Sequence, residues 1–212
     1  MGYAAKSSLD LRTRLVGLRV AVDVQHLYRE GQHAGDHGST FTLEGGGKIA
    51  EAQAAVAYAQ ALVAWLRARG AAVLTNEPAA GILTGPYSRR NAAALSWGAG
   101  AYLACHVNAG GGGYALAEYP LACEGQVLGD LIGAELVKRF REIRAHTTRA
   151  LSPGARGDVC IEGCSKDAPA IVLEPFFGDT PAMQPLFAAG RLTELGEAIG
   201  EAVASWWEKR RK

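Results

Sequence analysis

Cysteine is scarce in this sequence, and the four that occur form neither a disulfide framework nor a metal-binding pattern. Cys160 and Cys164 are separated by three residues, without a second pair at the spacing of a zinc knuckle. We therefore expect reduced, mostly buried thiols and no structural zinc site. A chain of 212 residues buries enough apolar surface to fold without such cross-links.

An excess of one charge is also missing. Lys and Arg number 22 and Asp and Glu number 21, which leaves a formal net charge of +1. A general nucleic-acid binder needs a clear basic excess to neutralise phosphates, so no nucleic-acid partner is expected. The basic run Lys209–Lys212 is more typical of a solubilised helix end than of a binding site.

Long hydrophobic runs are absent as well. The stretch of lowest polarity, from Ala52 to Leu66, contains two glutamines and is too short to span a bilayer, so no membrane insertion is expected. The N-terminal residues carry charges where a signal peptide needs an apolar run, and Lys6 replaces the hydroxyl residue of a myristoylation motif. These features predict cytoplasmic synthesis without a signal peptide, with external action only after release or unconventional export.

Segments with strand character alternate with segments of helical periodicity. The predicted strands cover 18–24, 71–75, 101–107 and 169–174, and the predicted helices cover 48–69, 89–97, 126–145 and 192–209. This alternation predicts a single α/β domain, phosphorylase/hydrolase-like, with a twisted, largely parallel (mixed) sheet flanked by helices. The Gly- and His-rich segment 31–47 has no period and is expected to be irregular.

Three polar residues follow predicted strands at the same structural position. His26, His106 and Glu174 each stand at the carboxyl end of a strand, where open α/β sheets form their ligand crevice. Glu51 lies in the first turn of a predicted helix and could reach the same edge. Two imidazoles and a carboxylate suit a catalytic zinc ion. Strand-end histidines are commonly only hydrogen-bonded, and a first-turn glutamate favours the helix dipole without any metal, so the residues alone leave both interpretations open.

Four sequence blocks resemble the signature blocks of a known enzyme family. They are DVQH (Asp23–His26), AEAQ (Ala50–Gln53), CHVNA (Cys105–Ala109) and PAIVLEPFFGD (Pro169–Asp179). Together with the spacing of Arg90 from His106 and the Arg156-Gly157 pair, they resemble the zinc-dependent N-acetylmuramoyl-L-alanine amidases of the amidase_3 type, found in bacterial autolysins and phage endolysins. The resemblance runs from about Leu18 to Trp206.

The resemblance implies an activity and a role for each residue. His26, Glu51 and His106 would bind Zn²⁺, and Glu174 would be the catalytic acid/base. The substrate would be peptidoglycan, cut at the amide bond between N-acetylmuramic acid and L-alanine. Zinc would polarise the lactyl carbonyl and acidify water, and Glu174 would pass a proton to the departing nitrogen.

The sequence departs from the family pattern around the first histidine. DVQHLY stands in place of D-P-G-H-G-G, so both glycines beside His26 are missing. The interval to Glu51 is longer than usual, and the extra residues supply His33 and His37 as rival ligands, which we rank low because loop histidines are usually solvated. Glu44 is a rival for the helix glutamate, and we favour Glu51 because its distance from Gly70 matches the family's helix length.

Three further residues are candidates for contact with the substrate. Asn108 precedes the Gly110–Gly113 run, which either lets a polymer approach the backbone or forms a flexible hairpin tip. Glu118 matches an acidic residue often seen there, either supporting the site or contacting substrate. Arg90, like Arg156, either faces peptide carboxylates or is structural, and we favour the structural role.

We therefore predict an amidase catalytic domain over 18–208, preceded by an extension over 1–17 and followed by the basic tail 209–212. The expected protein is a monomeric bacteriolytic enzyme of endolysin type. Two alternatives stay open. A zinc carboxypeptidase-like hydrolase on a related fold would use Arg90 or Arg156 for the terminal carboxylate of its substrate. A non-catalytic peptidoglycan-binding homologue is suggested by the missing glycines beside His26.

Overall fold

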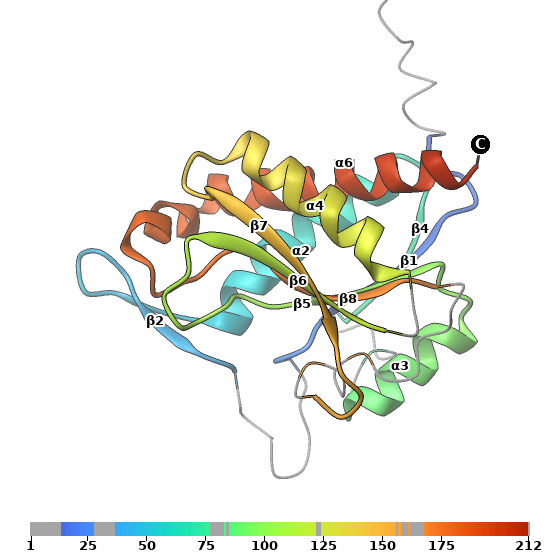
Figure 1. Ribbon diagram of the computed structural model, residues 1–212, viewed down its shortest axis with the longest axis horizontal. Coiled ribbons are helices and arrows are strands. Elements are labelled where there is room, and N and C mark those ends of the chain that lie inside the picture. Colours follow the sequence, from blue (N-terminus) through green and yellow to red (C-terminus); the bar gives the residue numbers. More distant parts are fainter. Residues whose placement is uncertain are drawn as a thin grey trace, which may run out of the picture.

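The computed structural model describes residues 14–27, 37–76, 83, 85–121, 124–155, 157, 161 and 168–211. These residues form helices on both faces of a central sheet (Figure 1). The helices are α2 (Glu51–Arg67), α3 (Tyr87–Ser96), α4 (Gly125–Arg139), η2 (Pro181–Phe187, a 3₁₀ helix) and α6 (Ala189–Arg210). The strands are β1 (Arg19–Val24), β2 (Thr40–Thr42), β3 (Lys48–Ala50), β4 (Ala72–Thr75), β5 (Ala101–Cys105), β6 (Tyr114–Pro120), β7 (Ala145–Leu151) and β8 (Ala170–Glu174).

The main sheet has six strands in the order β4-β1-β5-β8-β6-β7. Neighbouring strands run parallel except β6 and β8, which are antiparallel. The prediction of an α/β fold with a mixed, largely parallel sheet is therefore confirmed. Because β1, β5 and β8 are parallel neighbours, their carboxyl ends meet at one edge, as the site prediction requires.

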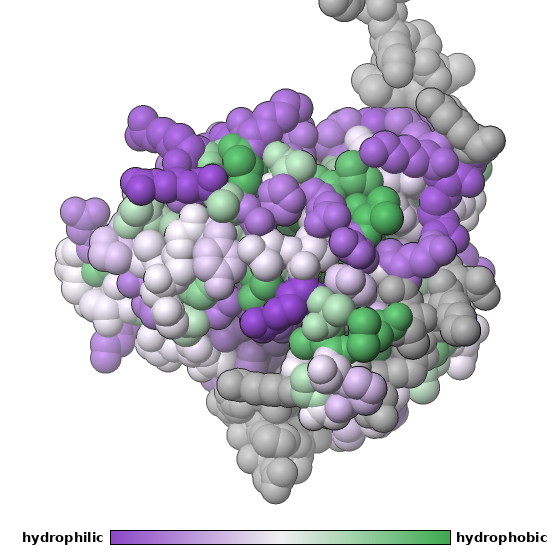
Figure 2. All heavy atoms as spheres, viewed as in Figure 1, coloured by the Kyte–Doolittle hydropathy of each residue, from purple (hydrophilic) through white to green (hydrophobic). Residues whose placement is uncertain are grey.

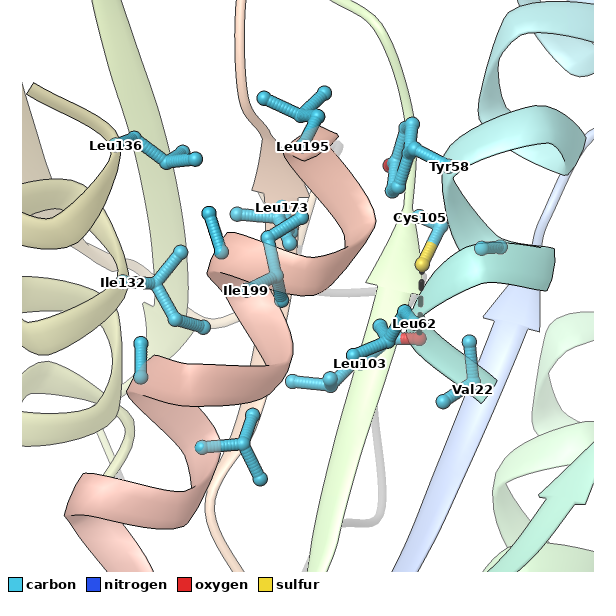
Figure 3. Packing of buried hydrophobic residues seen from close by; sticks show 14 of the residues in the cluster. Val22, Tyr58, Leu62, Leu103, Cys105, Ile132, Leu136, Leu173, Leu195 and Ile199 are labelled. Carbon is cyan, nitrogen blue, oxygen red and sulfur yellow. Dashed lines mark hydrogen bonds between the residues drawn. The ribbon is translucent and has the colours of Figure 1, made fainter. Parts of the chain in front are cut away.

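Successive side chains of the buried strands point to opposite faces of the sheet and pack into two hydrophobic cores. Val22, Leu103 and Leu173 pack with α2, α4 and α6 on one face of the sheet (Figure 3), and Ala21 and Tyr102 belong to a smaller core with α3 on the other. Burial on both faces explains why these strands are largely apolar, with Asp23 of β1 as a buried exception, rather than alternating in polarity.

The Cys105 thiol lies inside the larger core. It is fully buried in the described structure, and burial raises its pKa to about 12. The expectation of a buried, reduced thiol is confirmed for Cys105, whereas Cys123, Cys160 and Cys164 lie outside the described residues. A neutral thiol of this kind packs as a small apolar side chain.

Close packing between α2 and α6 depends on a glycine. A Cβ atom at Gly196 would lie 2.7 Å from the Leu62 backbone nitrogen. Only glycine lets the two helices approach this closely, which anchors the helix that carries Glu51 to the core.

Two predicted helices have different limits in the structure. The helix expected over 48–69 begins at Glu51, because residues 48–50 pair with β2 as strand β3. The helix expected over 126–145 ends at Arg139, and residues from Ala145 onward form β7. The prediction that the segment 31–47 is irregular is wrong for Thr40–Thr42, which form β2 by pairing with β3. Strands β6 and β7 have no counterpart among the predicted strands.

Strand β7 forms an edge of the sheet, and most of its side chains are exposed. In Figure 2, hydrophilic side chains are interspersed with hydrophobic ones over α4, and side chains of mostly intermediate hydropathy lie over β7. The charged side chain of Arg149 on this exposed edge disfavours pairing with another chain. Among the described residues, no helix is both long and apolar enough to cross a membrane.

Candidate metal centre

Three side chains meet at the carboxyl edge of the sheet. His26 follows β1, His106 follows β5, and Glu51 opens α2. One carboxylate oxygen, Glu51 Oε1, lies 3.3 Å from His26 Nε2 and 3.0 Å from His106 Nδ1. The two imidazole rings are perpendicular, with centroids 4.9 Å apart. The structure therefore brings together all three residues that the sequence predicted as ligands.

The segment before β2 holds Glu51 in place. The Ser39 backbone N–H donates to Glu51 Oε2 at 3.0 Å, and the carbonyls of Ser39 and His37 accept from the N–H groups of Glu51 and Ala52. These bonds satisfy amides that a helix start leaves without partners. Gly38 has a φ of +75°, and a Cβ atom there would collide with the Glu51 carboxylate. Glycine is thus required for this segment to close over the glutamate.

The electrostatics of the cluster favour an ionised Glu51. Burial raises its pKa, but the hydrogen bonds and charges of His106 and His26 outweigh burial and bring the pKa well below its usual range. Val107 N–H donates to Glu51 Oε1 at 3.2 Å, and Tyr58 Oη donates to the His106 carbonyl at 2.8 Å. The carboxylate and the His106 backbone are both fixed before any ligand arrives.

The donor set fits a zinc ion. Zinc takes nitrogen and oxygen ligands at about 2.0–2.2 Å, which places tetrahedral ligand atoms about 3.3 Å from one another. The two Glu51–histidine separations are close to that value, and all three ligand atoms lie within 4.8 Å of each other. A zinc ion held by these three side chains would keep a position open for water or substrate, as in catalytic zinc sites.

Glu174 is tied to this cluster through a short segment. The His106 backbone N–H donates to the Leu173 carbonyl at 3.0 Å, which places the ends of β5 and β8 side by side. Two residues after His106, the Asn108 side-chain amide donates to Glu174 Oε2. Residues 106–108 therefore supply a candidate metal ligand at one end and hold the predicted acid/base at the other.

Glu118 does not face open solvent. Its side chain is buried on β6 and accepts from the guanidinium of Arg149 on β7, with Nε at 2.8 Å. The Arg149 side chain is 62% exposed, and its pKa is raised chiefly by the hydrogen bond and charge of Glu118, with a smaller contribution from the charge of Glu174. Glu118 thus holds an exposed cation near Glu174. The sequence analysis missed Arg149, because β7 was not among the predicted strands.

Arg90 lies beneath the site and is completely buried. Its Nη1 donates to Asp23 Oδ1 at 2.9 Å, its Nε donates to the Gly85 carbonyl at 2.8 Å, and its Nη2 donates to the Leu27 carbonyl. The guanidinium supports the chain on both sides of His26 and has no surface for a substrate. Its burial supports the structural role over contact with a peptide carboxylate.

The rival ligands lie elsewhere or outside the described residues. Glu44 is exposed in the turn between β2 and β3, and His37 is exposed ahead of β2. Within the described part of the chain, the grouping that could hold a metal ion is His26, Glu51 and His106. His33 and Arg156 fall outside the described residues.

The glycine run after Asn108 is held in place. The N–H groups of Gly110 and Gly111 donate to the Asp179 carboxylate at 2.7 and 3.1 Å, and Thr180 Oγ1 donates to the Gly112 carbonyl at 2.7 Å. Two carboxylate bonds and a hydroxyl bond oppose the picture of a loose hairpin tip. The exposed side of Gly110 and Gly111 stays open, because an added Cβ atom would meet nothing within 4 Å.

Comparisons with known proteins agree with this geometry at the level of the fold. A scan against protein-family models and a search of curated proteins found no match. Solved structures do match. N-acetylmuramoyl-L-alanine amidase AmiC2 of Nostoc punctiforme has a TM-score of 0.69 and 19% identity, over 90% of this chain and 97% of that one. The CwlD amidase of Clostridioides difficile, solved with the GerS lipoprotein, has a TM-score of 0.69 and 13% identity, over 91% and 99%.

A third match is to part of a longer protein. Cwp6 from Clostridium difficile has a TM-score of 0.71 and 22% identity, over 90% of this chain but 29% of Cwp6. At such identities the likeness establishes the fold. The chain has the fold of N-acetylmuramoyl-L-alanine amidase catalytic domains of the amidase_3 type, as the sequence blocks predicted. On that fold it carries a His-Glu-His candidate metal site.

Proposed function

We propose that this protein is a zinc-dependent amidase that hydrolyses the bond between N-acetylmuramic acid and L-alanine in peptidoglycan. The observation that carries the proposal is the convergence of His26, Glu51 and His106 at the carboxyl edge, with Glu174 tied beside them. The fold is that of several solved amidases, including AmiC2. Fold alone does not define an activity, so the proposal rests on the site.

The residues of the chain divide the reaction between them. A zinc ion held by the three side chains would supply Lewis acidity and lower the pKa of water towards 7. Glu174 accepts the proton of the attacking water and delivers it to the nitrogen of L-alanine, which is a poor leaving group without it. The Asn108 amide donates to Glu174 Oε2 and so holds the carboxylate in place for this proton transfer.

The structure gives less support to the carboxypeptidase alternative. Such an enzyme needs an arginine that receives the terminal carboxylate of its substrate. The fully buried Arg90 has no surface for one, and the other candidate, Arg156, lies outside the described residues. The binding-homologue alternative rests on the missing glycines beside His26, yet the three ligands and Glu174 are present and assembled. Both alternatives are outcomes of the same experiment.

The proposal predicts a defined cleavage product. When purified peptidoglycan is digested with the zinc-loaded protein, mass spectrometry is expected to find new N-terminal L-alanine on released, intact stem peptides. A zinc chelator should abolish the release, and added zinc should restore it, because removal of the ion removes the acidification of water. Shortened stem peptides would instead identify a peptidase. Binding to peptidoglycan without any new ends would identify a non-catalytic homologue.

A further inference from the structure

Gln25 lies between the metal site and a buried polar network. It directly precedes His26, occupies the position of a glycine in the resembled pattern, and is completely buried. Its Oε1 is 3.0 Å from His106 Nε2, and its Nε2 is 3.5 Å from Tyr102 Oη. A buried amide bonded at both ends has a fixed orientation, and here one end reaches a candidate metal ligand.

The donor and the acceptor of each hydrogen bond in this network follow from Asp23, which lies at the end away from the metal site. Burial raises the pKa of Asp23, but its Oδ1 accepts from the fully buried Arg90 guanidinium and from the Asn76 amide, and these contacts hold Asp23 as a carboxylate that only accepts. Tyr102 Oη therefore donates to Asp23 Oδ2, at 2.5 Å. The Gln25 amide nitrogen then donates to a lone pair of the Tyr102 hydroxyl oxygen. The Gln25 carbonyl oxygen must then face His106, where it can only accept.

The two nitrogens of His106 face different partners. Nδ1 points into the cluster, 3.0 Å from Glu51 Oε1, whereas Nε2 points away from it to Gln25. A neutral imidazole that gives the lone pair of Nδ1 to a metal carries its proton on Nε2. That N–H is buried and would lose a hydrogen bond without an acceptor. The Gln25 carbonyl is the acceptor that the structure provides.

We propose that Gln25 is a positioning residue that fixes His106 in its metal-binding form, with the proton on Nε2 and Nδ1 turned to the metal. The assignment rests on the proposed zinc site. Asp23 orients the Tyr102 hydroxyl, and Tyr102 in turn orients the Gln25 amide. Partners of this kind raise the basicity of a histidine ligand and fix its ring, and their removal typically weakens metal binding about 10- to 100-fold.

The test compares three glutamine substitutions in metal-free protein titrated with zinc against a chromophoric chelator. Gln25→Met keeps the length of the side chain and removes the acceptor, and its zinc affinity is expected to fall about 10- to 100-fold. Gln25→Glu keeps an acceptor for the Nε2 proton, and its affinity should equal or exceed that of the wild type. Gln60→Met makes the same change at an exposed position of α2 and should bind zinc as the wild type does.

Each outcome decides the assignment. Thermal unfolding of the metal-free proteins separates a lost fold from a lost ligand partner, and rescue by Gln25→Glu is not expected from a merely structural residue. Equal zinc affinities for the wild type and Gln25→Met would overturn the role of Gln25 while leaving the amidase proposal intact. A wild type that binds zinc but leaves peptidoglycan uncut would overturn the amidase and leave Gln25 its role. A wild type without zinc affinity would overturn both.

Discussion

Glu174→Gln is expected to reduce peptidoglycan hydrolysis by about 10²- to 10⁴-fold in kcat, the range for loss of a general acid/base. The substituted amide keeps the size of the side chain but neither takes the proton from water nor delivers it to the leaving nitrogen. Zinc binding should be unchanged, because the ligands come from His26, Glu51 and His106. The rate of release of N-terminal L-alanine, measured at saturating zinc, is the readout.

A matched change elsewhere separates chemistry from charge. Glu124→Gln removes an exposed carboxylate that pairs with Arg210 and takes no part in the metal cluster, and it should leave the rate unchanged. If Glu174→Gln retained activity within about threefold of the wild type, another group would have to transfer the proton, and the assignment of Glu174 would be wrong.

Arg90→Met is expected to lower the free energy of unfolding by about 3–5 kcal/mol. The substitution leaves the Asp23 carboxylate buried without its counter-charge and removes the donors for the Gly85 and Leu27 carbonyls. In a domain of this size, such a loss lowers the melting temperature by about 6–20 °C. Urea unfolding of the metal-free protein measures the free energy directly.

The control for Arg90 is a surface arginine. The Arg141 side chain is 95% exposed, so Arg141→Met should change the unfolding free energy by less than about 0.5 kcal/mol. Asp23→Asn combined with Arg90→Met should cost less than the two single changes added together, because both remove one interaction. A loss below about 1 kcal/mol for Arg90→Met would show that the ion pair is not a support of the fold.

Elements with a clear hydrophobic pattern in their own residues could be predicted from the sequence. Strands β1, β5 and β8 are apolar runs buried on both faces, and α2 and α6 have clear helical periods, so their existence followed from the residues. The pairing of β6 and β7 did not, because β7 is an exposed edge strand without an apolar face. Helix α4 likewise stops earlier than predicted: it ends at Arg139, Phe140 has an extended backbone, and β7 begins at Ala145, which pairs with Tyr114.

The site divides in the same way. The three predicted ligands and Glu174 lie at the ends of strands or helices, in blocks that resemble a known family. Positions of this kind can be identified from the sequence alone. The roles of Gln25 and Arg149 depend on which side chains lie opposite, such as Tyr102 behind the amide and Glu118 beside the guanidinium. The substrate contacts and the endolysin setting stay predictions of the sequence.

The most direct test of the metal centre is equilibrium dialysis against zinc of three proteins: the wild type, Glu51→Gln and Glu44→Gln. Glu51 lies in the cluster, whereas Glu44 is the exposed carboxylate that competes with it in the sequence. The wild type and Glu44→Gln are expected to retain one zinc ion per chain. Glu51→Gln should bind more than about 100-fold more weakly, beyond the range for an outer partner. Equal retention by Glu51→Gln and Glu44→Gln, or no zinc on the wild type, would contradict the assignment of His26, Glu51 and His106 as a zinc site.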